Sequence, residues 1–339
     1  MSVSTAVQHP ILAPLPLPDL GRWRLRRAWP RSVDHLLLEL VDDDGVRVAA
    51  QWFADADRAR SVAARTPGSS RTGSVVLQPD GADRKLLRLT ELVRAAGHQL
   101  IAHRPERRAV VRTAAGYLKL VRPGKVAPTV WTARSAAGLD VGAPQVLEVD
   151  PIGGAIITET LPGVPLTDRL AGAGVEELCA TVGRLLARLH VVAPERVPGL
   201  AEHGPAQERA VLRRWTGLAE AYGVLQRQPE PSVADSGRRV LVHRDFHDGQ
   251  LLVDGGDVRA LDFDLLAVGD PALDVANFLA QLELRSAQGV LPDAESAGAA
   301  FLSGYRPDAA VSSAVPGYLA TARARLQAVY AFRNPEIGT

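Results

Sequence analysis

The period of the hydrophobic positions changes along the chain. Up to about residue 160, apolar residues form short runs separated by turn residues, for example at 35–41 and 117–121, and such runs are typical of β-strands. Beyond that point apolar residues recur every three or four positions, at 178–189 and again at 211–225, which is the period of an amphipathic helix. We expect the aromatic residues of the second helix, such as Trp215, to belong to the core. The pattern predicts an α+β protein whose strands precede its main helices.

The pattern also predicts three successive units. Residues 1–96 contain a proline-rich leader and a small α+β accessory unit, in which Asp83 is expected to cap a helix. Residues 97–160 are predicted to form a sheet, and residues 161–339 a helical lobe. The prolines and glycine of residues 162–165 supply the turn chemistry for the break between these two lobes.

Composition excludes several classes of protein. The chain has 39 lysine and arginine residues against 38 aspartate and glutamate residues, so no global field favours nucleic acid or a membrane surface as a partner. A single cysteine, Cys179, excludes an internal disulfide framework. No apolar stretch approaches the roughly 18 residues of a membrane span. These features predict a cytoplasmic protein, and its oligomeric state stays open.

Lysine is rare in this chain, which contains 36 arginines and three lysines. Lys119 falls inside a predicted strand, where a lone lysine in an arginine-rich chain invites a functional interpretation. Lys125 follows Pro123-Gly124 and is expected to be a solvated loop residue. Arg107 and Arg108, in the turn between the first two strands of the same sheet, could contact phosphate, but a solvated turn is the preferred interpretation. Lys119 is therefore the candidate functional lysine.

The residues best suited to catalysis lie in one stretch, Leu241 to Asp264, which runs LVHRDFHDGQLLVDGGDVRALDFD. An Asp-Gly-Gly-Asp turn between two short apolar runs predicts a β-hairpin. That hairpin places Asp245, Gln250 and Asp262 at the ends of strands. Phosphoryl transfer uses such a set: one carboxylate accepts the proton of the attacking hydroxyl, while an amide oxygen and a second carboxylate hold the magnesium ion.

These residues give the chain a family resemblance. It resembles the aminoglycoside phosphotransferase and choline kinase family of protein-kinase-like small-molecule kinases, which carries H-x-D-x-x-x-x-N, a hairpin and then D-F-D. His243, Asp245 and Asp262 match this pattern, and residues 269–274 are similar to the G-D-P-x-x-D that follows it. Gln250 stands where asparagine is usual, and its amide, one methylene further out, can still offer oxygen to a hard cation.

The resemblance implies a two-lobed, protein-kinase-like α+β fold that binds ATP (or GTP) and Mg²⁺. Lys119 matches the strand lysine that contacts the α- and β-phosphates, and Glu159 and Leu161 fall where the family grips adenine through the main chain. The chain departs from the kinase pattern after this lysine, because no glutamate lies between Leu120 and Leu147. We expect either another carboxylate, with Glu148 as a candidate, or the phosphates alone to orient Lys119.

The resemblance also assigns the chemical roles. It implies that Asp245 positions and deprotonates the acceptor hydroxyl, while Gln250 and Asp262 hold magnesium with Asp264 as a second candidate ligand. Three further residues complete the expected site: His243 as a support behind the magnesium aspartate, and His247 and Asp248 on the acceptor side. Asp274 is expected to brace the catalytic loop. By position alone, residues 20–96 are similar to the cap that precedes the ATP lobe in some bacterial sugar kinases of this superfamily. A packing module without chemistry is the preferred interpretation of these residues.

The predicted activity is ATP-dependent phosphorylation of a hydroxyl on a small molecule such as an antibiotic, a natural product or a sugar. Two alternatives remain open: a sugar or amino-alcohol kinase of primary metabolism, and a catalytically silent nucleotide-binding module. The plausible acceptor region offers few uncommitted acids, and it contains arginines such as Arg244, Arg285 and Arg306. Since buried ammonium groups need acidic partners, we expect a neutral or mildly charged acceptor rather than a polycation.

Overall fold

The computed structural model describes residues 15–334, which begin with an antiparallel sheet of five strands. In sheet order its strands are β1 (Arg24–Ser32), β2 (His35–Val41), β3 (Arg47–Phe53), β5 (Val75–Gln78) and β4 (Ser70–Thr72). Helix α1 (Ala56–Ala64) packs on β3 and β5. The predicted strand at residues 35–41 is confirmed, whereas α1 was not predicted.

The helix expected after Asp83 is shorter than its sequence pattern indicated, and only α2 (Leu89–Arg94) forms. The buried carboxylate of Asp83 does accept hydrogen bonds from the N–H groups of Lys85 and Leu86, as a cap would. It also accepts one from the Glu106 N–H at 2.7 Å and lies 3.0 Å from Nε2 of His103. Asp83 therefore ties the accessory unit to the next sheet, and the chain around it stays in turns.

The second five-stranded sheet is also antiparallel and forms one lobe of the molecule. In sheet order its strands are β6 (Gln99–Arg104), β7 (Arg108–Thr113), β8 (Gly116–Val121), β10 (Ala155–Thr158) and β9 (Val146–Asp150). Helix α3 (Val126–Ala137) packs against β9 and β10. Gly116 has a φ of +142°, and a Cβ there would meet the Thr158 carbonyl oxygen at 2.1 Å. Only glycine therefore permits this close pairing of β8 and β10.

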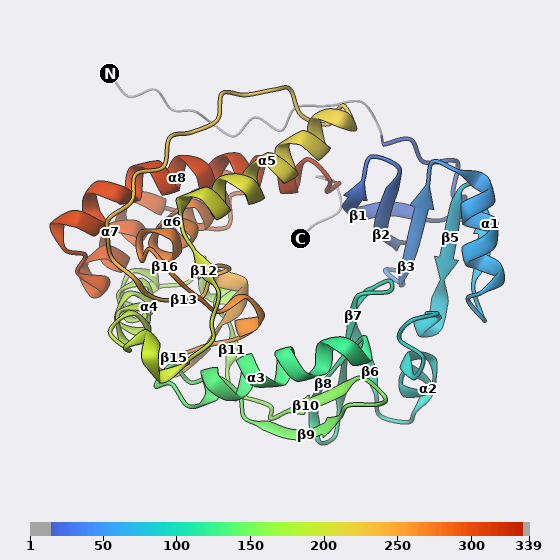
Figure 1. Cartoon of the computed structure of the whole chain (residues 1–339), viewed down its shortest axis with the longest axis horizontal. Helices are drawn as coiled ribbons and strands as arrows, with labels where there is room; N and C mark the ends of the chain where they lie inside the picture. The colour runs from blue at the N-terminus through green and yellow to red at the C-terminus, as the bar shows by residue number, and fades with distance from the viewer. Residues whose placement is uncertain (1–14, 335–339) are drawn as a thin grey trace.

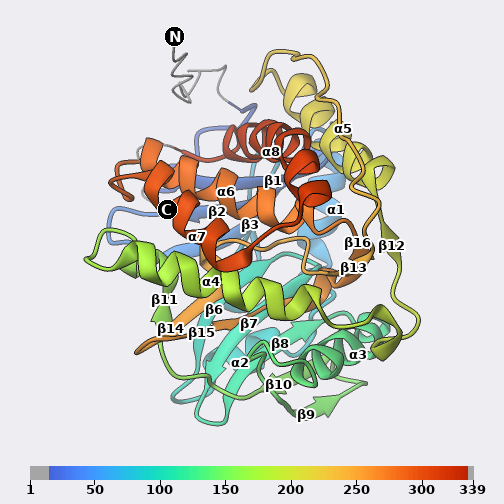
Figure 2. The same ribbon diagram turned by 90° about the vertical axis from the view of Figure 1, so that its left-hand side faces the viewer.

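The rest of the chain forms a helical lobe with two small sheets. Its helices are α4 (Val175–His190), α5 (Pro205–Ala221), α6 (Ala272–Ala287), α7 (Ala294–Tyr305) and α8 (Ala309–Tyr330). One small sheet has the order β11 (Val164–Pro165), β14 (Leu251–Asp254), β15 (Asp257–Ala260), and the other β12 (Glu202–His203), β16 (Ala267–Gly269), β13 (Val240–Val242). Figure 2 shows α4, α6, α7 and α8 stacked on one side of the molecule, away from the second sheet. The apolar face predicted at residues 178–189 is buried in this core.

The accessory unit touches both lobes, so the three parts surround a central region (Figure 1). Leu38 and Trp52 of the first sheet share one hydrophobic cluster with Ala219 of α5 and with Phe332, which follows α8. The Ala28 N–H donates to the Phe332 carbonyl at 2.8 Å. These contacts with the helical lobe add to the link that Asp83 makes with the second sheet.

The predicted α+β, protein-kinase-like class is confirmed by this arrangement of a sheet lobe followed by a helical lobe. The division of the chain at residues 96 and 160 stays a prediction. Among the helices of residues 15–334, none combines the length and the apolar character needed to cross a lipid bilayer.

Candidate active site

The hairpin predicted from the sequence brings two candidate magnesium ligands together. Strands β14 and β15 pair in antiparallel register through a turn at residues 254–257. At the open end of the hairpin, the Leu261 N–H donates to the Gln250 carbonyl oxygen at 2.8 Å. Asp262 follows directly in a left-handed conformation with a φ of +55°, a backbone region that aspartate tolerates better than most residues. Gln250 and Asp262 therefore lie beside each other.

Asp262 and Asp264 share two basic partners from the second sheet. The Lys119 ammonium donates to Asp262 Oδ1 at 3.0 Å and to Asp264 Oδ2 at 2.6 Å. Arg108 lies 3.3 Å from a carboxylate oxygen of each aspartate. Burial acts to raise the pKa of Asp262, but the charges of Lys119 and Arg108 outweigh it and hold that pKa far below its ordinary value. Asp262 is therefore ionised throughout the neutral range.

The missing kinase glutamate has a different replacement from the one expected. Helix α3 carries no acidic residue, and Glu148 is exposed on β9. Another carboxylate does reach Lys119, as one of the two alternatives had it, but the partners are the two aspartates after the hairpin and not the candidate Glu148. Lys119 lies on β8 opposite Val110 and Ile156, so the register of the sheet fixes its side of the site.

Asp274 braces the catalytic loop, as predicted. Its fully buried carboxylate accepts hydrogen bonds from the N–H groups of His243 at 2.6 Å and Arg244 at 2.7 Å. Nε2 of His243 lies 2.8 Å from the Leu261 carbonyl oxygen, which joins the loop to the segment before Asp262. The Asp245 N–H donates to Nδ1 of His243 at 3.3 Å, and the Asp245 carboxyl group is half exposed. The loop is therefore rigid behind a carboxylate that solvent and ligands can reach.

We expect Asp274→Ala to destabilise the protein by about 2–6 kcal/mol, because two buried backbone donors each lose a partner at about 1–3 kcal/mol. Chemical denaturation would measure this free energy of unfolding. Asp293→Ala is the matched control, because Asp293 caps α7 at the surface and its loss typically costs about 1 kcal/mol. Equal losses in the two variants would contradict the bracing role.

The two residues expected on the acceptor side differ in their surroundings. The Asp248 side chain is fully buried, and its Oδ2 accepts a hydrogen bond from Arg285 Nε at 2.7 Å. This burial argues against the predicted acceptor contact of Asp248 and gives it a part in holding the loop. His247 is partly exposed, and its Nε2 lies 3.8 Å from Asp245 Oδ1. Of this pair, His247 is the residue open to a ligand beside Asp245.

The segment after β10, where the family grips adenine, has one main-chain group already engaged. The Glu159 N–H donates to the Gln145 carbonyl at 3.0 Å, and the Glu159 carboxylate accepts from the Gln145 N–H at 2.9 Å. Within residues 15–334, no hydrogen bond involves the Leu161 N–H or the Glu159 carbonyl. These two groups are therefore free to pair with a nucleotide base.

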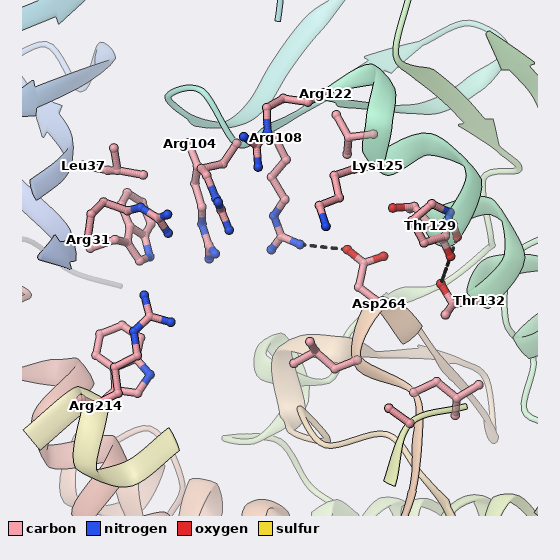
Figure 3. A pocket seen from close by; sticks show the side chains of 18 of the residues that line it. Arg31, Leu37, Arg104, Arg108, Arg122, Lys125, Thr129, Thr132, Arg214 and Asp264 are labelled. Carbon is pink, nitrogen blue, oxygen red and sulfur yellow. Dashed lines mark hydrogen bonds and ion pairs between the residues drawn. The ribbon is translucent and has the colours of Figure 1, made fainter. Parts of the chain in front are cut away.

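A cavity of about 630 Å³ adjoins Arg108 and Asp264 and lies between the accessory unit, the second sheet and the helical lobe. Figure 3 shows the side chains of Arg31, Arg104, Arg108 and Arg214 pointing into it. Seven basic residues line the cavity, namely Arg31, Arg104, Arg107, Arg108, Arg122, Lys125 and Arg214. Asp264 is its only acidic lining residue among those that the structure describes.

This cavity overturns one expectation from the sequence and adds a lining role to three other residues. Arg108 is not solvated, because it pairs with Asp262 and Asp264. Arg107 and Lys125 keep solvent exposure, but both line the cavity. Trp215 is only partly buried and lines the same cavity while packing against the first sheet. No pattern local to these residues could have identified them, since the cavity joins positions from Trp29 to Leu266.

The residues present suit a magnesium ion held jointly with a nucleotide. Within the described residues, no group of three or more His, Cys, Asp or Glu side chains forms a complete metal site. Mg²⁺ is usually held by one or two carboxylates together with substrate phosphates and water, rather than by an all-protein cage. Asp262 and Asp264 already share one cationic group, the Lys119 ammonium. With the adjacent Gln250, they fit such a site.

Comparison with known proteins shows the family of the chain. A sequence model of the phosphotransferase enzyme family matches residues 100–311, well over half of the chain. No curated protein sequence matches the chain significantly. Among solved structures, the chain is similar to the aminoglycoside phosphotransferase APH(3'')-Id from Streptomyces rimosus ATCC10970, with a TM-score of 0.51 and 20% identity over 74% of this chain and 97% of that chain.

Two further solved structures are also similar to this chain. One is the same Streptomyces rimosus enzyme in complex with ADP and streptomycin, with a TM-score of 0.50 and 20% identity over 71% of this chain and 98% of that chain. The other is a macrolide 2'-phosphotransferase from Brachybacterium faecium, with a TM-score of 0.44 and 23% identity over 70% of this chain and 92% of that chain. The chain belongs to the phosphotransferase enzyme family and is a small-molecule kinase.

Proposed function

We propose that this protein transfers the γ-phosphoryl group of ATP to a hydroxyl of a small molecule, with Asp245 as the catalytic base. The observation that carries the proposal is the meeting of Lys119 with Asp262 and Asp264, which lie 143 and 145 residues further along the chain. A strand lysine and two aspartates at the end of a hairpin form the phosphate and magnesium end of a kinase site. The rigid loop carrying Asp245 lies next to it.

In the proposed reaction, the Asp245 carboxylate accepts the proton of the acceptor hydroxyl as its oxygen bonds to the γ-phosphorus. The bond from that phosphorus to the bridging oxygen breaks, and ADP leaves with the electron pair. Lys119 stabilises the charge on the phosphates. The free Leu161 N–H and Glu159 carbonyl position the nucleotide base. Gln250, Asp262 and Asp264 would hold magnesium, which when bound neutralises phosphate charge and fixes its geometry.

The acceptor and the nucleotide are parts of the same proposal. A solved relative binds ADP and streptomycin, which supports a nucleotide and a hydroxylated small molecule for this chain; GTP is an alternative donor. The seven basic residues of the cavity disfavour a polycationic acceptor. A sugar or amino-alcohol kinase of primary metabolism would use the same chemistry. A catalytically silent nucleotide-binding module is the alternative without turnover.

A two-step screen tests the proposed function. The melting temperature would first be measured with Mg²⁺ and a non-hydrolysable ATP analogue across a panel of hydroxylated compounds, because a ligand of the folded state stabilises it. ATP and GTP consumption would then be measured with the stabilising compounds. We expect at least one of them to accelerate nucleotide consumption and to gain a phosphoryl group. Stabilisation without any consumption would favour the silent module.

We expect Lys119→Ala to raise the KM for ATP and to lower kcat, because both aspartates of the site lose the group that pairs them and the phosphates lose a cation. Steady-state kinetics over ATP concentration would measure both parameters. Arg112→Ala is the matched control, since Arg112 is an exposed base on the neighbouring strand β7. A larger change in the KM for ATP in the control than in Lys119→Ala would contradict the assignment.

A further inference from the structure

The cavity beside the proposed active site holds a local excess of positive charge that the chain as a whole does not have. Seven basic side chains and one acidic side chain line its volume of about 630 Å³. The cavity therefore has an excess of six positive charges, whereas the net charge of the whole chain is +1. Cavities of about 300–1,000 Å³ are the usual size for small-molecule sites. A cavity lined by charges of one sign concentrates ligands of the opposite sign.

Most of these bases have no acidic partner. Among the described residues, no carboxylate forms an ion pair with Arg31, Arg107, Arg122 or Arg214. Burial, followed by repulsion from Arg214 and Arg122, lowers the pKa of Arg31. Burial and repulsion from Arg31, Arg122 and Arg214 likewise lower the pKa of Arg107. The folded protein therefore holds like charges together at a cost that a bound anion would offset.

These four arginines come from all three parts of the molecule. Arg31 lies near the end of the accessory strand β1, and Arg214 lies on α5 of the helical lobe (Figure 3). Arg107 and Arg122 flank strands of the second sheet. Arginine presents a planar fork of N–H donors that matches phosphate and carboxylate groups. Convergence of such groups from three units is what a site for one multiply charged group requires.

The cavity is next to the proposed chemistry, so its ligand would be close to the transferred group. Arg108 lines the cavity and contacts Asp262 and Asp264. Arg104 also lines the cavity. Burial lowers the pKa of Arg104 to about 10, and the nearby charges of Asp262 and Asp245 act against this shift. Arg104 is held over the Trp29 ring, with its Cζ 4.9 Å from the centroid.

We propose that the acceptor is an anionic hydroxylated molecule, such as a sugar monophosphate, whose phosphate or carboxylate group binds Arg31, Arg107, Arg122 and Arg214. This rests on the proposed function in that the molecule in the cavity is the phosphoryl acceptor. A phosphomonoester carries about −1.5 to −2 charges at pH 7, which fits a group of four unpaired guanidinium ions. The inference replaces the neutral acceptor expected from the sequence, and it gives the accessory unit a role in recognition through Arg31.

The nucleotide alone does not account for these charges. Its triphosphate is assigned to Lys119 and to the magnesium site, with Arg108 as the cavity base that contacts both aspartates. Arg31 and Arg214 belong to neither that cluster nor the second sheet. They are therefore the residues whose substitution separates an acceptor anion from the nucleotide.

The test compares hexose monophosphates with their parent hexoses and with a kanamycin-type polycation, by calorimetric binding in the presence of Mg²⁺ and a non-hydrolysable ATP analogue. We expect the monophosphates to bind at least tenfold more tightly than the parents, and the difference to shrink with added salt. The double variant Arg31→Gln, Arg214→Gln should lose most of that difference while keeping its affinity for the analogue. Arg213→Gln is the matched control, because Arg213 is an exposed neighbour on α5 that pairs with Glu230.

Three results would overturn the inference: equal affinity for monophosphates and parents, preference for the polycation, or an equal loss of analogue and monophosphate binding in the double variant. ATP consumption over the same panel separates this inference from the proposed function. Consumption with neutral or cationic acceptors alone keeps the kinase function and rejects the anionic acceptor. Monophosphate binding without consumption supports the anion site and contradicts the kinase function. If the double variant fails to fold, the affinity ratio and its salt dependence in the unaltered protein still decide.

Discussion

Asp245→Asn is expected to lower kcat by at least the roughly 10²- to 10⁴-fold that a general base typically contributes, while nucleotide affinity stays nearly unchanged. The reason is that the substitution removes the proton acceptor but keeps the size of a side chain that is half exposed. The loop around it is held by Asp274 and His243, so its backbone should not move. Turnover with the acceptor found by screening would measure the loss, and calorimetry with the ATP analogue would measure affinity.

Asp254→Asn is the matched control for this prediction. Asp254 lies in the turn of the β14–β15 hairpin, has an exposure similar to that of Asp245 and pairs with Arg259 at 3.1 Å rather than with Lys119. We expect this variant to keep the turnover of the unaltered protein. If Asp245→Asn retained more than about a tenth of that turnover, the assignment of Asp245 as the base would be wrong.

Asp262→Ala is expected to abolish magnesium-dependent nucleotide binding, whereas Gln250→Ala weakens it less. Asp262 supplies an ionised carboxylate to a hard cation, and without it the remaining carboxylate, Asp264, has to pair with both Lys119 and Arg108. Gln250 supplies a neutral amide, and water can occupy its coordination position. Titration of Mg²⁺ in the presence of the ATP analogue, followed by the shift in melting temperature, would rank the two variants.

The comparison of these two variants needs a folding control. The melting temperature of each variant without ligand shows whether it folds, since Asp262→Ala also leaves Lys119 and Arg108 with Asp264 alone. An equal loss of magnesium-dependent stabilisation in the two variants would contradict the ranking. Unchanged binding in Asp262→Ala would remove Asp262 from the magnesium site.

The sequence predicted those parts of the fold that local pattern determines. Strand β2 has the predicted bounds, and the hairpin at residues 251–260 follows from its Asp-Gly-Gly-Asp turn and its apolar runs. Helix α1 escaped prediction because only Ala59 and Val62 of its nine residues are buried, which leaves a weak periodic signal. The helix after Asp83 was overestimated because a distant partner, the Glu106 N–H, shares the capping carboxylate.

In the candidate site, too, the sequence predicted the residues that lie close together in the chain but not most of their distant partners. Asp245, Gln250 and Asp262 were found because they lie within 18 residues of one another in a recognisable order. The partners of Asp262 are 143 and 154 residues away, so the pairing of Lys119 was predicted only in outline and that of Arg108 not at all. The basic cavity depends on the packing of three units. Each of its arginines resembles an ordinary surface residue in an arginine-rich sequence.

Mass spectrometry of the acceptor would detect the proposed phosphoryl transfer to a small molecule at Asp245. The protein would be incubated with Mg²⁺, ATP and the acceptors that stabilise it, beside Asp245→Asn and Asp254→Asn. With the unaltered protein and with Asp254→Asn, we expect an acceptor that is heavier by one phosphoryl group, formed together with ADP. With Asp245→Asn, we expect this product to be nearly absent. Product formation at similar rates in all three proteins, or ADP without any phosphorylated acceptor, would contradict the proposed phosphoryl transfer.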